Sequence, residues 1–87
     1  MDVYRLTLKK SASKELQAVS GKETLDKLIE KIKELAINPR PQGSEKLAGR
    51  SNLYRFRQGD YRVIYSVDDQ SRLVDIIKIG HRRDVYR

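Results

Sequence analysis

The chain has 87 residues, a length that fits one domain with a modest hydrophobic core. It lacks cysteine, which excludes disulfides and thiolate metal sites, and no apolar run has the length of a signal core or a membrane span. We therefore expect a cytoplasmic protein with no membrane partner. The 19 basic and 12 acidic residues give a net charge of +7, which favours nucleic acid or an acidic protein as partner.

The N-terminal segment predicts a strand followed by a short helix. Residues 3–8, VYRLTL, alternate between apolar and polar side chains, the pattern of a half-buried strand. Ser11 has the side chain of a helix N-cap, and the helix is expected to run to about Val19, before Gly21.

Residues 22–39 contain the clearest helix of the sequence, which Asn38-Pro39 ends. Its apolar residues recur at the helical spacing, with charged residues on the other face. They are Leu25, Leu28, Ile29, Ile32, Leu35 and Ala36. We expect this helix to pack on a sheet. Residues 39–52 form a polar loop too short to separate two domains, so residues 1–87 are expected to be one domain.

Three further strands are predicted at residues 52–58, 60–67 and 72–80. Gly59-Asp60 joins the first pair as a hairpin, and residues 68–70 join the second pair. The order β-α-α-β-β-β predicts an α+β domain. Its antiparallel sheet would have two N-terminal helices on one face and an open second face.

The first hairpin is expected to bring arginines together. With a two-residue turn at Gly59-Asp60, Arg57 lies directly opposite Arg62, about 5 Å away at Cβ, and Arg55 follows two positions along. Like charges in this position destabilise a hairpin, so the arrangement calls for an acidic side chain or a bound phosphate. Arginine suits phosphate because its planar fork donates two hydrogen bonds at once.

The other face of this hairpin is apolar and aromatic, and we interpret it as core rather than as a platform for stacking bases. It carries Tyr54, Phe56, Tyr61, Val63, Tyr65 and Val67. The chain then ends in IGHRRDVYR, residues 79–87. If the last strand lies beside the hairpin, His81, Arg82, Arg83 and Tyr86 would line the same concavity as the arginines.

The stretches LAGRSNLYRFRQGDYRVIYSV and IGHRRDVYR resemble the RelE/ParE superfamily of toxins, most closely its RelE branch of ribosome-dependent messenger-RNA endonucleases. The resemblance covers nearly the whole chain. It implies a RelE-like fold, a toxin of a type II toxin–antitoxin system, and an acidic RelB-like antitoxin, the ribosome and mRNA as partners. It also implies cleavage by the 2′-hydroxyl to a 2′,3′-cyclic phosphate, with no metal and no cofactor.

The resemblance also assigns roles. Arg62 and Arg82 would stabilise charge on the phosphate, and Arg55 and Arg57 would position the RNA backbone. Tyr86 would orient the RNA or stack on a base. All are candidate catalytic residues.

The chain departs from the family pattern at three positions. Lysine is frequent in the family where this chain has Arg55 and Arg57, and arginine is a poor proton carrier, so His81 is the candidate to move protons. Ala48 stands where a basic residue is expected. Its neighbours Lys46 and Arg50, together with Arg83, are candidate RNA-binding residues.

Three other functions remain open. A ParE-like poison of DNA gyrase would share the fold without the catalytic residues, although Arg62, Arg82 and Tyr86 together argue against it. The chain would otherwise be a basic RNA-binding domain that does not cut, or a domain whose basic face only docks an acidic antitoxin.

Overall fold

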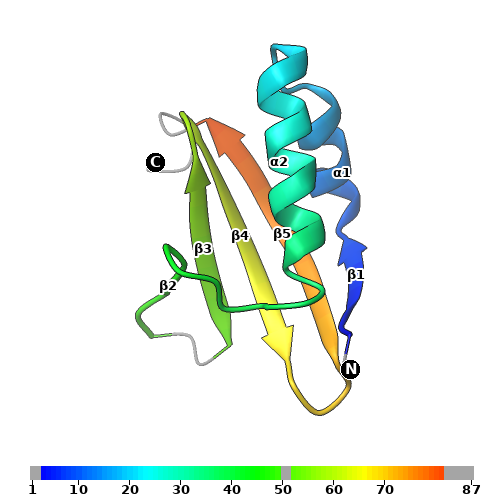
Figure 1. Ribbon diagram of the computed structural model, residues 1–87, viewed down its shortest axis with the longest axis vertical. Helices are drawn as coiled ribbons and strands as arrows, with labels where there is room; N and C mark the ends of the chain where they lie inside the picture. The colour runs from blue at the N-terminus through cyan, green and yellow to red at the C-terminus, as the bar shows by residue number, and fades with distance from the viewer. Residues whose placement is uncertain (1–2, 50–51, 82–87) are drawn as a thin grey trace.

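The computed structural model describes residues 3–49 and 52–81, which form two helices and a five-stranded sheet (Figure 1). The sheet has the order β1-β5-β4-β3-β2. The helices are α1 (Lys10–Gln17) and α2 (Lys22–Glu34). The strands are β1 (Arg5–Leu8), β2 (Glu45–Lys46), β3 (Leu53–Gln58), β4 (Tyr61–Asp68) and β5 (Leu73–His81). No described helix is long and apolar enough to cross a bilayer.

Strands β3, β4 and β5 form the predicted antiparallel meander, and the first hairpin has the predicted register. Gln58 pairs with Tyr61 and Arg57 with Arg62. Gly59 has a φ of 61°, which suits the first position of a two-residue turn whose twist matches that of the strands. Both the turn and the face assignments that depend on it are therefore confirmed.

The sheet is mixed, so the expectation of a purely antiparallel sheet was wrong at β1. β1 runs parallel to β5, from Arg5 opposite Leu73 to Leu8 opposite Ile76. A parallel pair needs a long crossover, and the two helices with the meander supply it. Glu45–Lys46, predicted as loop, adds a two-residue strand along β3.

The first helix also begins earlier than predicted. Lys9 occupies the N-cap position with extended backbone angles and no side-chain capping bond, and Ser11 lies inside α1. The side chain expected to cap the helix therefore does not do so.

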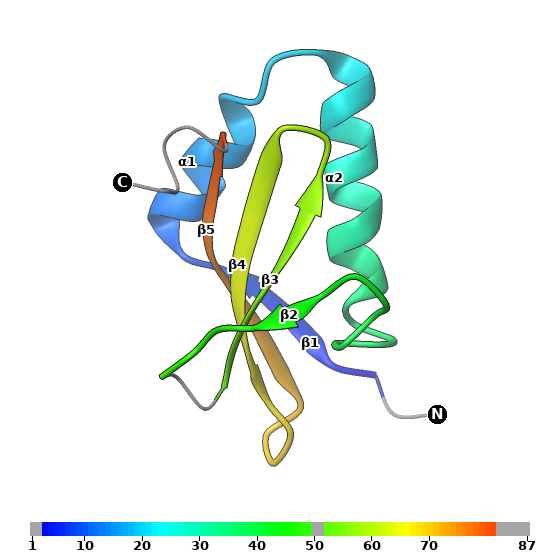
Figure 2. The same cartoon turned by 90° about the vertical axis from the view of Figure 1, so that its left-hand side faces the viewer.

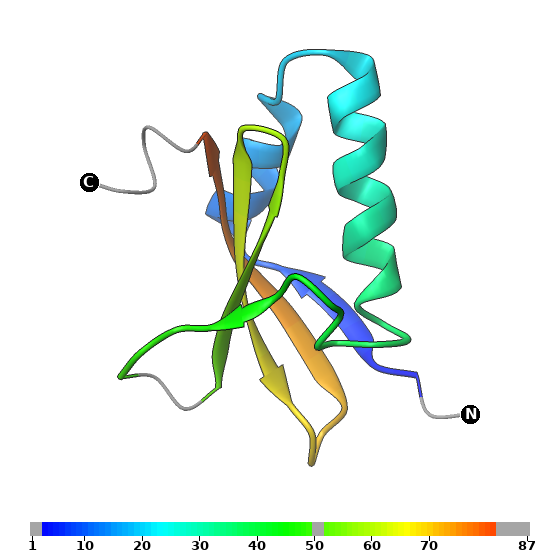
Figure 3. The ribbon, with the colours of Figure 1, turned by 60° about the vertical axis from the view of Figure 1, so that its left-hand side comes forward.

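One hydrophobic core lies between the helices and the sheet, and it includes the predicted aromatic face. Figure 2 and Figure 3 show α2 standing along one face of the β3–β4 hairpin, while α1 lies next to β5. The helices contribute Ala12, Leu28 and Ile32 to the core, with Val19 just after α1 and Leu35 just after α2. The sheet contributes Phe56, Val63, Tyr65, Val67, Val74, Ile76 and Ile79. Tyr54 and Tyr61 are half-buried against them, so the interpretation of these aromatics as core is confirmed.

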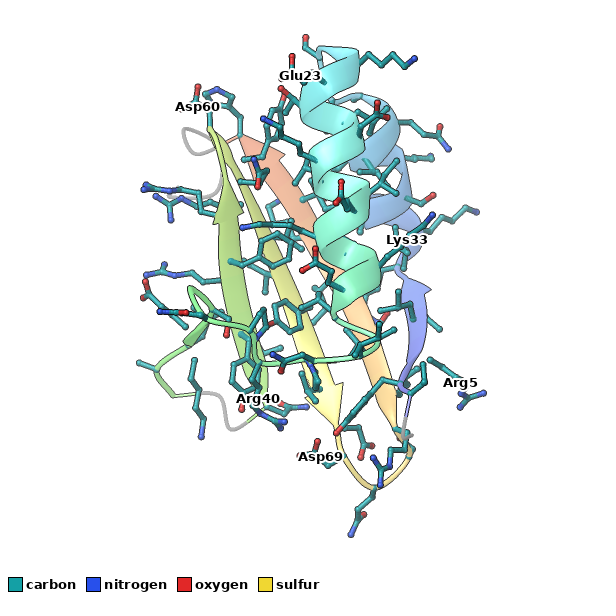
Figure 4. The ribbon with its side chains drawn as sticks, in the orientation of Figure 1. Arg5, Glu23, Lys33, Arg40, Asp60 and Asp69 are labelled. Carbon is teal, nitrogen blue, oxygen red and sulfur yellow. The ribbon has the colours of Figure 1, made fainter. Side chains whose placement is uncertain are left out.

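A polar cluster around Arg40 holds the end of the sheet at the β4–β5 turn (Figure 4). The Arg40 guanidinium donates from Nη2 to Asp69 Oδ2 at 2.7 Å, from Nη1 to Oδ1 at 3.2 Å, and from Nε to the Tyr54 hydroxyl at 3.0 Å. The Tyr4 hydroxyl also donates to Asp69. These bonds hold the pKa of Asp69 below its usual value, chiefly through Arg40. This Arg40 cluster joins the residue before β1, the loop after α2, β3 and the β4–β5 turn.

Candidate nucleic-acid interface

The three arginines of the β3–β4 hairpin line one hollow at the surface. Arg55 and Arg57 come from β3 and Arg62 from β4, and the hollow, of about 510 Å³, lies where α2 and the loop after it approach β3. Strand alternation directs the three arginines away from the core face of the hairpin, and Phe56 of that core face also lines the hollow. The local pattern of the hairpin therefore creates the basic cluster.

Directly opposed charges are present at the centre of this cluster. Arg57 faces Arg62 across the hairpin, with Arg57 exposed and Arg62 only 9% exposed. Two arginine side chains that project from directly opposed strand positions favour a bound anion, since a phosphate can accept hydrogen bonds from both. Burial of Arg62 strengthens this preference because the local dielectric is lower than in water.

An acidic side chain supplies part of the negative charge that was expected beside the opposed arginines. Glu45 on β2 lies opposite Arg55, with its Oε2 3.2 Å from Arg55 Nη2. Both side chains contact solvent, so the pair is exchangeable and is expected to be weak. Glu45 therefore forms an ion pair with one of the three arginines that line the hollow.

Two side chains of α2 that the sequence reasoning missed complete the hollow. Lys31 lies 5.7 Å from the centre of the Phe56 ring, and Glu34 is one turn further along the helix. The described lining thus has four cationic side chains and two carboxylates. Lys31 follows Leu28 by three positions, so its place at the margin of the apolar stripe was the available signal.

His81 is not brought into this hollow. It pairs with Tyr61, and the two rings meet edge to face at 5.5 Å between centroids. Gly80 is the residue opposite Arg62. His81 therefore faces the side of the sheet that carries Tyr61, where it lines a second hollow between the hairpin turn and the start of α2.

The remaining predicted residues are distributed as follows. Lys46 is exposed on β2, opposite Tyr54, and is not among the residues that line the arginine hollow. Arg50, Arg82, Arg83 and Tyr86 lie outside the described residues. Within residues 3–49 and 52–81, no group of three histidine, aspartate or glutamate side chains is arranged to hold a metal ion. The expectation of a metal-free site stays a prediction.

Fold and site together define a small α+β domain with a basic hollow suited to a polyanion. A family model described as ParE toxin of type II toxin-antitoxin system, parDE, matches residues 6–86. Toxin RelE of Mycobacterium tuberculosis (strain ATCC 25618 / H37Rv) is 31% identical over 84 residues, which cover 97% of this chain and 87% of that protein. The chain therefore belongs to the RelE/ParE toxin family of type II toxin–antitoxin systems, as its sequence motifs indicated.

Solved structures agree with this assignment. The archaeal RelE–RelB complex from Pyrococcus horikoshii OT3 contains a chain that matches with a TM-score of 0.81 and 35% identity, covering 92% of this chain and 96% of that one. The isolated E. coli RelE toxin matches with a TM-score of 0.79 and 30% identity, covering 95% and 90%. The fold is thus the RelE-like α+β fold that the sequence predicted.

Proposed function

We propose that this protein is the toxin of a toxin–antitoxin pair and that it cleaves messenger RNA on the ribosome. The observation that carries the proposal is the hollow in which Arg57 faces Arg62 beside Arg55. Membership of the toxin family and similarity to RelE toxins support the same function.

In the proposed reaction the 2′-hydroxyl oxygen of a nucleotide attacks the adjacent phosphorus in line. The phosphorus–5′-oxygen bond breaks, which leaves a 2′,3′-cyclic phosphate and a 5′-hydroxyl. One proton leaves the 2′-hydroxyl and one reaches the departing 5′-oxygen. Arg62 and Arg82 would stabilise the charge that builds on the phosphate oxygens, with Arg55 and Arg57 holding the backbone.

His81 is the proposed group for proton transfer. An imidazole side chain suits acid–base catalysis, but His81 faces the Tyr61 side of the sheet. Its proposed role therefore requires RNA to reach around the end of β5. Replacing His81 with alanine should slow cleavage and flatten its pH dependence near neutrality. A pH profile of unchanged shape in His81→Ala would assign proton transfer to another group.

The proposed partner is an acidic RelB-like antitoxin. Structures similar to this chain include RelE–RelB complexes from Pyrococcus horikoshii and E. coli. A net charge of +7 attracts an acidic chain, and added salt should weaken that complex because exposed charges are screened within about 8–10 Å. Expression of the protein alone should arrest growth, and an acidic protein encoded beside it should restore growth.

The decisive experiment is single-turnover cleavage of a ribosome-bound message, with ribosome binding measured separately. Arg82→Ala should slow cleavage by roughly 10²–10³-fold, the value of one positioned donor. Arg83→Ala, which removes the next arginine in the sequence, is the matched control and should be mild. Equal losses in both variants, only in proportion to lost binding, would show that the arginines act as an electrostatic tether.

Gyrase poisoning is the second candidate function because the matching family model is described as a ParE toxin. A gyrase poison would inhibit supercoiling by purified gyrase and leave ribosome-bound message intact. The two assays, run on the same preparation, separate the candidates.

A further inference from the structure

The outer edge of β5 changes partner halfway along the strand. β1 pairs with β5 as far as Leu8 opposite Ile76, and the Lys9 amide then donates to the Ile76 carbonyl at 2.9 Å. Beyond this point the chain turns into α1, which lies beside the second half of β5 (Figure 3). The last part of this edge therefore needs another source of hydrogen bonds.

One carboxylate on α1 supplies them. Glu15 Oε1 accepts a hydrogen bond from the Ile79 amide at 2.9 Å, and Oε2 accepts one from Lys78 Nζ at 3.0 Å. Glu15 thus holds the backbone of one residue and the side chain of the preceding one. Bonds to a charged acceptor are stronger than bonds between neutral groups, and this carboxylate is only 31% exposed.

The helix that carries Glu15 is itself anchored. Ala12, one turn before Glu15 on α1, is fully buried in the core, and Ile79 is 1% exposed. The carboxylate therefore connects two fixed elements rather than two flexible ones. A strand end without such a partner opens readily, because its amides exchange their bonds with water.

This end of β5 leads to the residues of the proposed reaction. Gly80 lies opposite Arg62 and His81 opposite Tyr61, and Arg82 follows in the sequence. We propose that Glu15 is a positioning residue for cleavage. It fixes the end of β5 so that Gly80 stays opposite Arg62 and His81 stays opposite Tyr61. This inference rests on the proposed function, since it concerns the same reaction.

Three variants separate the two bonds of Glu15. Glu15→Ala removes both, Glu15→Gln keeps an oxygen for the Ile79 amide without the charge, and Lys78→Met removes only the ion pair. Glu30→Gln, an exposed carboxylate on α2, is the matched control.

The first measurement is the rate of amide hydrogen exchange at Ile79, which NMR monitors on the full chain. Exchange should accelerate at least about tenfold in Glu15→Ala, because the amide loses its acceptor at a strand end. Glu15→Gln and Lys78→Met should change it less, and Glu30→Gln not at all. Unchanged exchange in Glu15→Ala would overturn the inference without reference to catalysis.

The second measurement is single-turnover cleavage with saturating ribosomes, below the melting temperature of every variant. Glu15→Ala should cleave about 10–100-fold more slowly with unchanged ribosome binding, since small misplacements of reacting groups cost rates of this order. Glu15→Gln should recover most of the rate. Fast Ile79 exchange together with wild-type cleavage in Glu15→Ala would overturn the positioning role. If the wild-type protein cleaves no message, both the proposed function and the positioning role are wrong. The exchange data still report on the Glu15 contact in that case.

Discussion

The two ends of β4 use arginine in opposite ways. At the β4–β5 turn, the Arg40 guanidinium donates three hydrogen bonds within the protein, two to Asp69 and one to Tyr54. At the other end, Arg57 and Arg62 face each other across the hairpin and line a hollow open to solvent. Asp69 neutralises the charge of Arg40 within the protein, whereas like charges at directly opposed strand positions raise the energy of the hairpin and favour an anion. The arrangement of charges around an arginine, rather than charge alone, therefore identifies a candidate binding site.

The largest expected effect lies at the hollow. Arg62→Ala should slow single-turnover cleavage by roughly 10²–10³-fold, because the proposed reaction loses a buried donor for the phosphate oxygens. Arg40→Ala, at the other end of β4, is the control and should retain the rate at temperatures where it is folded. Comparable losses of rate in both variants would contradict the division of roles between the two ends.

The Arg40 cluster is expected to affect stability rather than cleavage. Asp69→Asn should lower the melting temperature by a few degrees at neutral pH, since an exposed but multiply bonded carboxylate is worth a modest amount. The pKa of Asp69 is depressed in the fold, so its contribution is present above the unfolded value of about 4 and is lost as pH falls through the lower folded value. Thermal melts from pH 7 to pH 2 should show the two proteins converging in acid. A difference in melting temperature between the two proteins that stays constant down to pH 2 would show that it does not come from the charge of Asp69.

A smaller effect is expected from the exposed member of the opposed pair. Arg57→Gln should weaken RNA binding and reduce the slope of log affinity against log salt by about one, the value of one phosphate contact. It should also raise stability slightly, by about 0.2–1 kcal/mol, because a like-charged cross-strand pair is removed. Salt titrations and denaturant unfolding of the same variant measure both. Lower stability together with weaker binding would mean that Arg57 also supports the fold.

The smallest effect is expected from Glu45, which forms an ion pair with Arg55. Glu45→Gln should strengthen binding of a non-cleavable RNA about two- to fivefold at low salt, since a phosphate no longer displaces a carboxylate from Arg55. The gain should disappear at high salt, where exposed charges are screened. Glu30→Gln removes the same charge from α2 and should show less gain. An equal gain in both variants would indicate net charge alone.

Local chemistry made much of the fold and part of the site predictable. Gly59-Asp60 fixed the hairpin register, and the register placed Arg57 opposite Arg62 with the aromatics in the core. The partner of β1 was not predictable in this way. The VYRLTL pattern indicates a strand but carries no information about which strand it pairs with or in which direction.

The contacts that the sequence did not reveal join segments far apart in the chain. Arg40 meets Asp69, and Glu15 meets Ile79, through the packing of separate elements rather than through any spacing along the sequence. The face of His81 was missed for a related reason. Register across β4 and β5, which includes an irregularity between Ile64 and Tyr65, decides which side of the sheet His81 takes.

The parallel pairing of β1 with β5 also governs how this protein is made. Among the strands that the structure describes, β1 is synthesised first and β5 last, so Arg5 can pair with Leu73 only after the intervening chain has been made. Contacts between residues so far apart along a chain form late, because a large loop must close first. A nascent chain therefore cannot finish folding until the residues of β5 have emerged, and a product truncated before Leu73 lacks both the neighbour of β1 and the segment that Glu15 holds. Synthesis of β5 is thus required before its parallel pair with β1 can form.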